Sequence, residues 1–211
     1  MGRRPHDKAP LSPIPLFGLT GGIASGKSTV AAILTKHQVP LVDADLVARD
    51  VVAPDSPGLQ AIVKSFGKNI LLPDASLDRE QLGALIFSDN DARERLNTLI
   101  HPLIRAQMAQ EVSAHASRGS RFVVMDVPLL FETGNPDDYD EILVVYVDKT
   151  TQLQRLMKRD GFNRKDAQAR LDAQLSMAEK AQRATVLIDN SGARESTERQ
   201  VMTWLNGLSK K

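Results

Sequence analysis

Short apolar runs alternate along the chain with longer stretches in which apolar residues recur every three or four positions. A short run bounded by glycine or acidic residues is typical of a strand that is covered on both faces of a sheet. Recurrence at the helical spacing is typical of an amphipathic helix that buries one side. The runs predict five strands, at residues 16–20, 39–42, 122–125, 142–147 and 186–188.

Helices are predicted between and after these strands. The first begins after the glycine pair at 21–22, the clearest covers residues 96–112, and a shorter one covers 201–208. Strands that alternate with helices are joined by right-handed crossovers, which produces a parallel sheet with helices on both faces. We therefore predict an α/β fold in which ligands bind beyond the carboxyl ends of the strands.

The length of 211 residues predicts one globular domain rather than two large ones. Residues from about 57 to 118 exceed what a minimal sheet requires and are predicted to form a helical substrate-binding lobe. The basic helical residues from about 149 to 181 are predicted to form a hinged lid, with a pair of solvated charged helices as the alternative. The predicted core comprises about 16–56, 119–148 and 182–211, after a disordered, proline-rich tail at 1–15.

The amino-acid composition limits the kinds of molecule that the protein is expected to bind. Lysine and arginine number 27 and aspartate and glutamate 26, so the formal net charge is +1 and any anion site must be local. We expect neither nucleic acid nor membrane as a partner, since no apolar run approaches the roughly 18 residues of a membrane helix. The absence of cysteine excludes disulfides and thiolate chemistry and suits the reducing cytoplasm, where we expect the protein. We expect a monomer or a weak homo-oligomer.

Residues 21–28, Gly-Gly-Ile-Ala-Ser-Gly-Lys-Ser, match the phosphate-binding pattern G-x-x-x-x-G-K-[S/T] between a predicted strand and a predicted helix. Glycines let successive backbone N–H groups converge on phosphate oxygens, and the start of a helix adds further donors. In this pattern Lys27 lies along the β- and γ-phosphates, and the Ser28 hydroxyl is a ligand of Mg²⁺. An ordinary glycine-rich turn is the alternative, and the flanking strand and helix argue against it.

Acidic residues after the second and third predicted strands are candidates for the chemistry opposite the nucleotide. The N-K-x-D and D-x-x-G motifs of GTPases are missing at the expected places, so an adenine nucleotide is favoured. Asp43 and Asp45 follow the second strand, which we expect beside the phosphate-loop strand. A carboxylate there would deprotonate an acceptor hydroxyl or hold Mg²⁺ through water, and helix capping is the alternative, with more weight for Asp43. Asp126, after the third strand, is a weaker candidate for reaching Mg²⁺ through water.

Basic residues outside the loop provide further candidates. Arg155 and Arg159 are one helical turn apart in the predicted lid, so they share a face. Closure of the lid would bring their guanidinium groups to the transferring phosphoryl group and expel water. His101 is either a substrate ligand or a partly buried, hydrogen-bonded histidine, and Pro102 is expected to begin or kink a helix.

Several ordered motifs of the chain together resemble the dephospho-CoA kinase family. Many kinases share the phosphate loop, but its combination with D-A-D, H-P and P-L-L-F-E is specific. The similarity extends from about Leu16 to Leu208 with the family's order and spacing. The residues that carry it are Leu19 to Thr29, Val42 to Asp45 with Ala48 and Arg49, Leu96 and Asn97 with His101 and Pro102, Pro128 to Glu132, Gln152 and Leu153 with Arg155, Arg159 and Asp160, and Ile188 to Asn190.

The resemblance implies both an activity and a fold. The activity is ATP-dependent phosphorylation of the ribose 3′-hydroxyl of dephospho-CoA, which gives coenzyme A and ADP in the last step of coenzyme A biosynthesis. The fold is a P-loop, nucleoside-kinase-like α/β/α arrangement of three layers, with a five-stranded parallel sheet, a helical CoA-binding lobe and a lid. ATP and Mg²⁺ are the implied cofactors, and dephospho-CoA is the implied small-molecule partner.

The family's motifs also imply roles for individual residues. Asp45 matches the family's proposed base, and Lys27, Arg155 and Arg159 match its other catalytic positions. The implied ATP-binding positions are Gly22, Ile23, Ala24, Ser25, Gly26, Lys27, Ser28 and Thr29, with Asn190 on the adenine side. The positions implied to face the acceptor are Thr20, Asp45, Arg49, His101, Leu129 and Glu132.

One residue departs from the family's pattern, and two other functions compete with the implied one. Ala24 stands where the family often has glycine, a replacement that a methyl group tolerates if the φ angle there is negative. One competing function is that of another small-molecule P-loop kinase, acting on a nucleoside, shikimate or gluconate. The other is a binding module that uses ATP as a conformational switch and forms no phosphorylated product.

Overall fold

The structure, a computed structural model, describes residues 12–208. Most of the proline-rich tail that the sequence predicts to be disordered lies outside the described residues. The described residues divide into two compact units, one of residues 12–42 with 115–208 and the other of residues 43–114. No helix within the described range is both long enough and apolar enough to cross a membrane.

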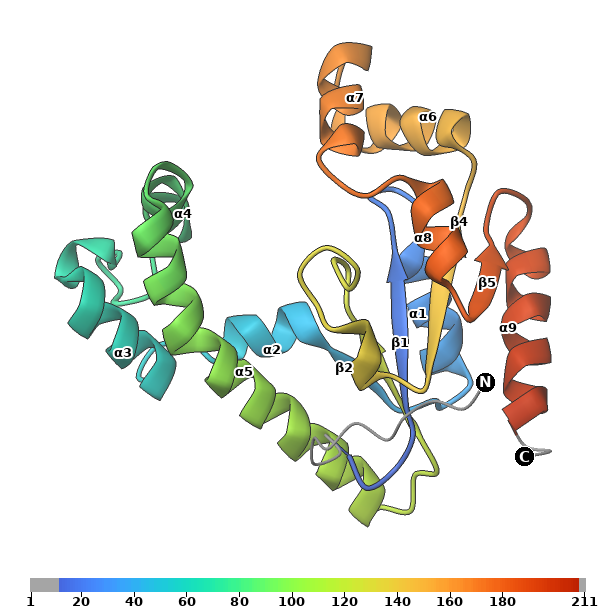
Figure 1. Cartoon of the computed structure of the whole chain (residues 1–211), viewed down its shortest axis with the longest axis horizontal. Helices are drawn as coiled ribbons and strands as arrows, with labels where there is room; N and C mark the ends of the chain where they lie inside the picture. The colour runs from blue at the N-terminus through green and yellow to red at the C-terminus, as the bar shows by residue number, and fades with distance from the viewer. Residues whose placement is uncertain (1–11, 209–211) are drawn as a thin grey trace. The chain divides into compact units, whose positions relative to one another are not determined.

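The first unit contains the predicted five-stranded sheet, in the order β2-β3-β1-β4-β5 (Figure 1). β1 is parallel to both β3 and β4, and β4 is parallel to β5. Leu19 lies opposite Asp126 on one side and Leu143 on the other, so the central strand and its neighbours end at one edge. The strands are β1 (Leu16–Gly21), β2 (Leu41–Asp43), β3 (Val123–Asp126), β4 (Glu141–Tyr146) and β5 (Val186–Asp189).

The expectation that the second strand lies beside the phosphate-loop strand is wrong. β3 lies between β1 and β2, so the strand next to β1 ends at Asp126 and not at Asp43. Burial gives the physical reason. All four residues of β3 are buried, whereas β2 has three residues and buries only Val42, as suits a short strand at the edge of a sheet.

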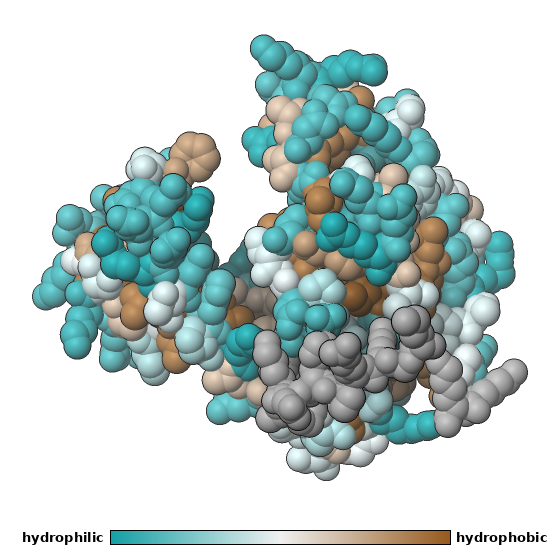
Figure 2. Space-filling model, in the orientation of Figure 1, coloured by the Kyte–Doolittle hydropathy of each residue, from teal (hydrophilic) through white to brown (hydrophobic). Residues whose placement is uncertain are grey.

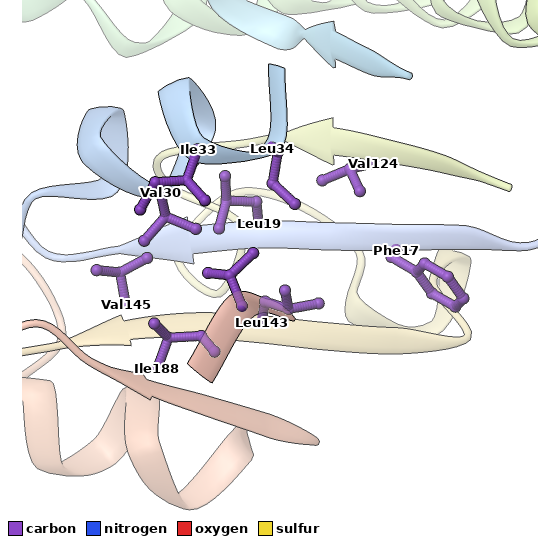
Figure 3. Packing of buried hydrophobic residues seen from close by; sticks show 10 residues of the cluster. Phe17, Leu19, Val30, Ile33, Leu34, Val124, Leu143, Val145 and Ile188 are labelled. Atoms are coloured by element: carbon purple, nitrogen blue, oxygen red, sulfur yellow. The ribbon is translucent and has the colours of Figure 1, made fainter. Parts of the chain in front are cut away.

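Side chains of β4 alternate between the two faces of the sheet and bury a different cluster on each. Leu143 and Val145 pack with α1 (Lys27–Lys36) and α9 (Arg194–Leu208) through a cluster that includes Leu19, Leu34 and Val201 (Figure 3). Ile142 and Val144 belong to a second cluster with Leu130, Phe131 and Met177, the first residue of α8 (Met177–Arg183). Helices therefore cover both faces, and the predicted three-layer α/β/α fold is confirmed.

The basic segment after β4 consists of helices with well-defined ends. α6 (Lys149–Asp160) begins at Asp148, whose side chain accepts a hydrogen bond from the Thr151 N–H at 2.9 Å. It ends at Gly161, whose φ of 71° is left-handed, and α7 (Arg164–Asp172) follows. The two helices share a small core of Leu153, Leu156, Ala167 and Leu171, and their visible outer surface is largely hydrophilic (Figure 2).

The second unit, residues 43–114, is helical. It contains α2 (Ala44–Asp50), α3 (Pro57–Phe66), the 3₁₀ helix η1 (Lys68–Ile70), α4 (Arg79–Ser88) and most of α5 (Asn90–Ser117). Pro102 lies inside α5 and does not begin a helix. A further 3₁₀ helix, η2 (Pro136–Asp138), belongs to the first unit.

Candidate active site

The phosphate loop connects β1 to α1 through a tight turn. The Ser25 N–H donates to the Gly22 carbonyl at 3.0 Å, and Gly26 then precedes the helix with a left-handed φ of 87°. A Cβ atom at Gly26 would lie 2.1 Å from the side-chain nitrogen of Asn190. Both the backbone conformation and the available space therefore require glycine at this position.

Backbone donors accumulate at the start of α1. The N–H groups of Ala24, Gly26, Lys27 and Ser28 make no hydrogen bond to any residue in the range 12–208. The next N–H group, that of Thr29, donates to the Gly26 carbonyl at 2.9 Å. Four unbonded N–H groups at the start of one helix, one of them from a lysine whose side chain adds a positive charge, form a site for an anion such as a phosphate chain.

The loop lysine is held by the acidic residue at the end of β3. Lys27 Nζ forms an ion pair with Asp126 Oδ1, and the two side chains are 21% and 6% exposed. The weaker of the acidic candidates from the sequence thus contacts the loop directly. The order of the strands accounts for this contact, because β3 and β1 are neighbours.

The hydroxyl groups near the loop have different surroundings. Thr20 is fully buried and donates to the Pro128 carbonyl at 3.0 Å, so its side chain joins β1 to the segment after β3. Ser28 is exposed, and its hydroxyl has no hydrogen-bond partner among residues 12–208. No group of three or more histidine, cysteine, aspartate or glutamate side chains able to hold a metal exists in that part of the chain. Mg²⁺ typically takes few protein ligands beside phosphate and water, so an exposed serine oxygen fits it.

Asn190 braces the phosphate loop from the end of β5. Its side-chain nitrogen donates to the Ser25 carbonyl at 2.8 Å, and its side-chain oxygen accepts from the Thr197 hydroxyl at 2.9 Å. Its backbone carbonyl accepts from the Arg155 guanidinium at 2.9 Å. The residue implied to lie on the adenine side therefore supports the loop with its side chain.

The two arginines of the predicted lid differ in their contacts. Arg155 is half-buried and contacts the Asn190 carbonyl, beside the loop. Arg159 is exposed and donates two hydrogen bonds to Asp160, at 2.7 and 2.9 Å. These bonds lower the pKa of Asp160 and raise that of Arg159. Of these two arginines, Arg155 contacts a residue that supports the phosphate loop and Arg159 does not.

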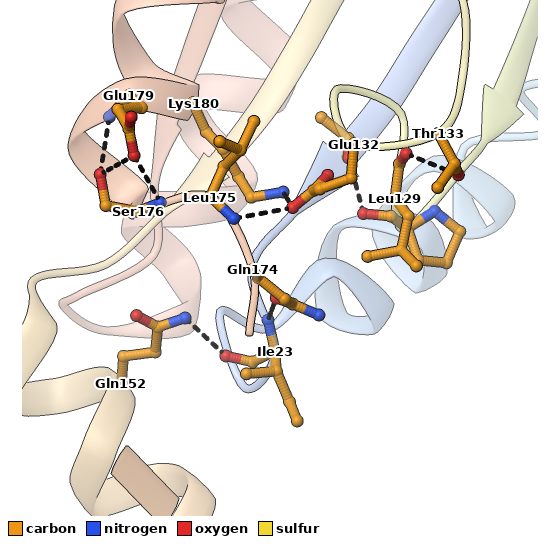
Figure 4. Close-up of polar contacts among 12 residues, drawn as sticks. Ile23, Leu129, Glu132, Thr133, Gln152, Gln174, Leu175, Ser176, Glu179 and Lys180 are labelled. Atoms are coloured by element: carbon orange, nitrogen blue, oxygen red, sulfur yellow. Dashed lines mark hydrogen bonds and ion pairs between the residues drawn. The ribbon is translucent and has the colours of Figure 1, made fainter. Parts of the chain in front are cut away.

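Glu132, in the P-L-L-F-E motif after β3, joins this motif to the start of α8. Its Oε1 atom accepts from Lys180 Nζ at 2.5 Å and from the Leu175 N–H at 3.1 Å (Figure 4). The Lys180 side chain is completely buried, which is rare for lysine unless it is paired. Leu129, in the same motif, is 38% exposed and so is available to a ligand.

In the second unit, the two aspartates of the D-A-D motif differ in their hydrogen bonds. Asp43 caps α2, because its Oδ1 atom accepts from the N–H groups of Asp45 and Leu46 at 2.8 and 3.1 Å. The Asp45 carboxylate is exposed and has no hydrogen-bond partner within residues 12–208, so it does not act as a cap. Arg49 on α2 and His101 on α5 are also exposed, and the interpretation of His101 as a partly buried histidine is wrong.

The comparison with known proteins decides the family. A sequence model for dephospho-CoA kinases matches residues 15–196. The chain belongs to the dephospho-CoA kinase family. It is 50% identical over 197 residues to a dephospho-CoA kinase of Geobacter metallireducens, covering 92% of this chain and 98% of that protein. It is 48% identical over 185 residues to that of Shouchella clausii, covering 88% and 94%.

A solved structure of the same family supports the assignment. The dephospho-CoA kinase from Campylobacter jejuni has a TM-score of 0.70 and 29% identity, covering 92% of this chain and 97% of that one. The similarity spans nearly the whole of both chains. The family's fold is therefore present here together with its phosphate loop.

Ala24 does not have the negative φ angle that a methyl group prefers. Its φ is 59°, in the left-handed region. Its side chain packs against the core shared by α6 and α7, beside Ile23. The tight turn of the loop imposes this conformation whichever residue occupies it, so alanine here carries backbone strain.

We expect Ala24→Gly to raise the free energy of unfolding by about 0.5 kcal/mol, because relief of left-handed strain exceeds the entropy cost of glycine and the lost methyl contact. Differential scanning fluorimetry measures this as a small rise in Tm. Ala32, exposed within α1, is the matched control, and Ala32→Gly is expected to lower stability by about 1 kcal/mol. A fall in Tm for both variants would contradict the strain at Ala24.

Three residues that lie around the loop and its support have no role that could be inferred from the sequence motifs. Gln152 and Gln174 both form hydrogen bonds with Ile23, and Lys180 is buried against Glu132. For Gln152 and Lys180 the sequence contained one indication, namely a polar residue at a helix position where the spacing of the apolar residues predicts an apolar one. Each occupies a buried position of its helix, where an apolar residue is expected.

Proposed function

We propose that this chain transfers the γ-phosphoryl group of ATP to the ribose 3′-hydroxyl of dephospho-CoA, giving coenzyme A and ADP. The observation that carries the proposal is the row of four unbonded N–H groups at the start of α1, in a chain whose family model covers residues 15–196. The row provides a site for the phosphates of the nucleotide. The family provides the identity of the acceptor.

On the nucleotide side, residues Gly22 to Thr29 bind the triphosphate. The free N–H groups hold phosphate oxygens, and Lys27 exchanges Asp126 for the β- and γ-phosphates. Ser28 provides one oxygen ligand for Mg²⁺, and the metal neutralises charge on the phosphates when it is bound. Asn190 keeps the loop in shape through the Ser25 carbonyl.

On the acceptor side, Asp45 is the general base. Its exposed carboxylate takes the proton of the 3′-hydroxyl as the oxygen attacks the γ-phosphorus and ADP leaves. Arg155 and Arg159 neutralise the charge that the phosphoryl group carries during transfer, and Arg159 releases Asp160 to do so. The further contacts to dephospho-CoA come from Thr20, Arg49, His101, Leu129 and Glu132.

The organisation of the chain follows from these roles. We assign acceptor binding to the helical segment of about 57–118 and closure over ATP to the segment of about 149–181. Closure protects ATP from hydrolysis by excluding water. We place the enzyme in the cytoplasm, because a chain without cysteine suits that reducing compartment. We further propose that it is a monomer or a weak homo-oligomer.

One assay tests this function. The purified chain is incubated with ATP, Mg²⁺ and dephospho-CoA, and we expect coenzyme A by mass spectrometry together with an equal amount of ADP. Parallel reactions contain shikimate, gluconate or a nucleoside in place of dephospho-CoA. Faster ADP release with one of those acceptors would identify a different small-molecule kinase. ATP-dependent capture of a partner without any phosphorylated product would identify a conformational switch.

A further inference from the structure

Ile23, in the phosphate loop, has both of its backbone polar groups bound by glutamine side chains (Figure 4). The Gln152 side-chain nitrogen donates to the Ile23 carbonyl at 2.8 Å. The Gln174 side-chain oxygen accepts from the Ile23 N–H at 2.8 Å. Gln152 lies on α6 and Gln174 between α7 and α8, so both come from the segment predicted to form the lid.

The bond from Gln152 sets the direction of a donor in the phosphate site. The Ile23 carbonyl and the Ala24 N–H belong to one planar trans peptide, so they point in opposite directions. When Gln152 holds the carbonyl on its side, the Ala24 N–H must point away from Gln152. That N–H is one of the four unbonded donors at the start of α1.

The bond to Gln174 has the corresponding effect on the preceding peptide. The Ile23 N–H and the Gly22 carbonyl share a second planar unit, and that carbonyl accepts from the Ser25 N–H at 3.0 Å. Gln174 therefore stabilises the turn that leads to Gly26. Together the two glutamines orient both peptides on either side of Ile23.

Both glutamines are well supported. Gln152 is 7% exposed and is flanked on α6 by the buried Leu153. The residue after Gln174 is Leu175, whose N–H donates to Glu132, and Glu132 is held in turn by the buried Lys180. Apolar packing of Ile23 and Ala24 against the α6–α7 core adds to the polar contacts.

We propose that Gln152 and Gln174 are positioning residues for the triphosphate, which orient the Ile23 peptides so that the Ala24 N–H is available to a phosphate oxygen. The proposal rests on the proposed function as an ATP-dependent kinase. It assigns the segment of 149–181 a second role, since this segment then shapes the nucleotide site in addition to contributing arginines. The two glutamines differ in chemistry, because Gln152 must donate whereas Gln174 must accept.

Substitution by glutamate separates the two roles. Gln152→Glu and Gln174→Glu introduce the same charge beside the same residue, but a carboxylate accepts hydrogen bonds and does not donate them. Gln154, exposed on α6, is the control site, and Gln154→Glu adds that charge to the same helix away from Ile23. Gln152→Met removes the donor without adding charge, in case the carboxylate prevents folding. Each variant is tested for Tm, for affinity to a non-hydrolysable ATP analogue, and for KM and kcat with dephospho-CoA.

We expect Gln152→Glu and Gln152→Met to raise the Kd of the ATP analogue and the KM for ATP by about tenfold, with kcat within about threefold of wild type. Gln174→Glu is expected to change the same Kd by less than about threefold, because its acceptor is retained. Gln154→Glu is expected to behave as wild type.

Equal rises in Kd for the two glutamate variants at 152 and 174 would overturn the proposal, since charge alone would then explain both. A lower Tm with unchanged Kd would also overturn it, because the contacts would then serve stability only. A wild-type chain that binds the analogue but does not phosphorylate dephospho-CoA contradicts the proposed function and leaves the comparison of Kd values intact. A wild-type chain that binds no nucleotide contradicts both.

Discussion

Lys27→Ala is expected to lower kcat/KM for ATP by about 10³-fold, because it removes the ammonium group that we propose neutralises charge on the transferring phosphoryl group. Steady-state assays with dephospho-CoA measure the loss, and titration with an ATP analogue measures the accompanying weakening of binding. The same substitution removes an ion-pair partner of Asp126, whose side chain is 6% exposed. We therefore expect the free energy of unfolding to fall by about 1–3 kcal/mol as well.

The double variant Lys27→Ala with Asp126→Asn separates these two effects. It removes the buried negative charge together with the ammonium group, so we expect Tm to recover toward the wild-type value. Activity is expected to stay low, because the lysine is still missing. Recovery of activity in the double variant would show that Lys27 acts through folding, and near-normal turnover in Lys27→Ala would contradict the assignment of the phosphate loop.

Asp45→Asn is expected to lower kcat by about 10²-fold with the KM for ATP nearly unchanged, as follows from loss of a general base that does not contact the nucleotide. Because the Asp45 side chain is exposed, we expect its replacement to change the free energy of unfolding very little. Steady-state rates at saturating ATP and dephospho-CoA measure the change, and thermal melts verify that the variant is folded.

The neighbouring aspartate offers a matched control for Asp45. Asp43 accepts the two N–H groups at the start of α2, and asparagine caps helices about as well as aspartate. Asp43→Asn should therefore leave both kcat and Tm close to wild type. An equal loss of kcat in the two variants, or an unchanged kcat in Asp45→Asn, would remove the assignment of Asp45 as the base.

Much of the fold was predictable because its signals are local. Apolar runs identify the five strands to within about two residues. The signal is clearest for β1, β3 and β4, because these strands are buried on both faces and admit few polar side chains. The phosphate loop was equally visible, because its glycines and its lysine are adjacent in sequence. The order of the strands in the sheet could not be predicted, because an apolar run indicates that a strand is present but not which strand it pairs with.

The missed parts of the site depend on contacts between distant segments. Ile23 and Gln174 are separated by 151 residues, and no local pattern pairs a loop peptide with a glutamine so far along the chain. The sequence left the sign of the Ala24 φ angle open, and the angle is positive because the geometry of the turn outweighs the preference of a single residue. The buried position of Gln152 on α6 was the available signal, since a polar side chain on an apolar helix face requires a partner.

The bracing of the loop by Asn190 has a consequence for how the enzyme matures during translation. The phosphate-binding motif is synthesised well before its supports, because Asn190 follows Ser25 by 165 residues and Thr197 follows Asn190 by a further 7. Domains generally fold as units once their chain is complete. A nascent or truncated chain that ends before Asn190 thus carries the complete phosphate-binding motif without the two residues that brace it, and we expect it to bind a phosphate chain more weakly than a chain that contains them.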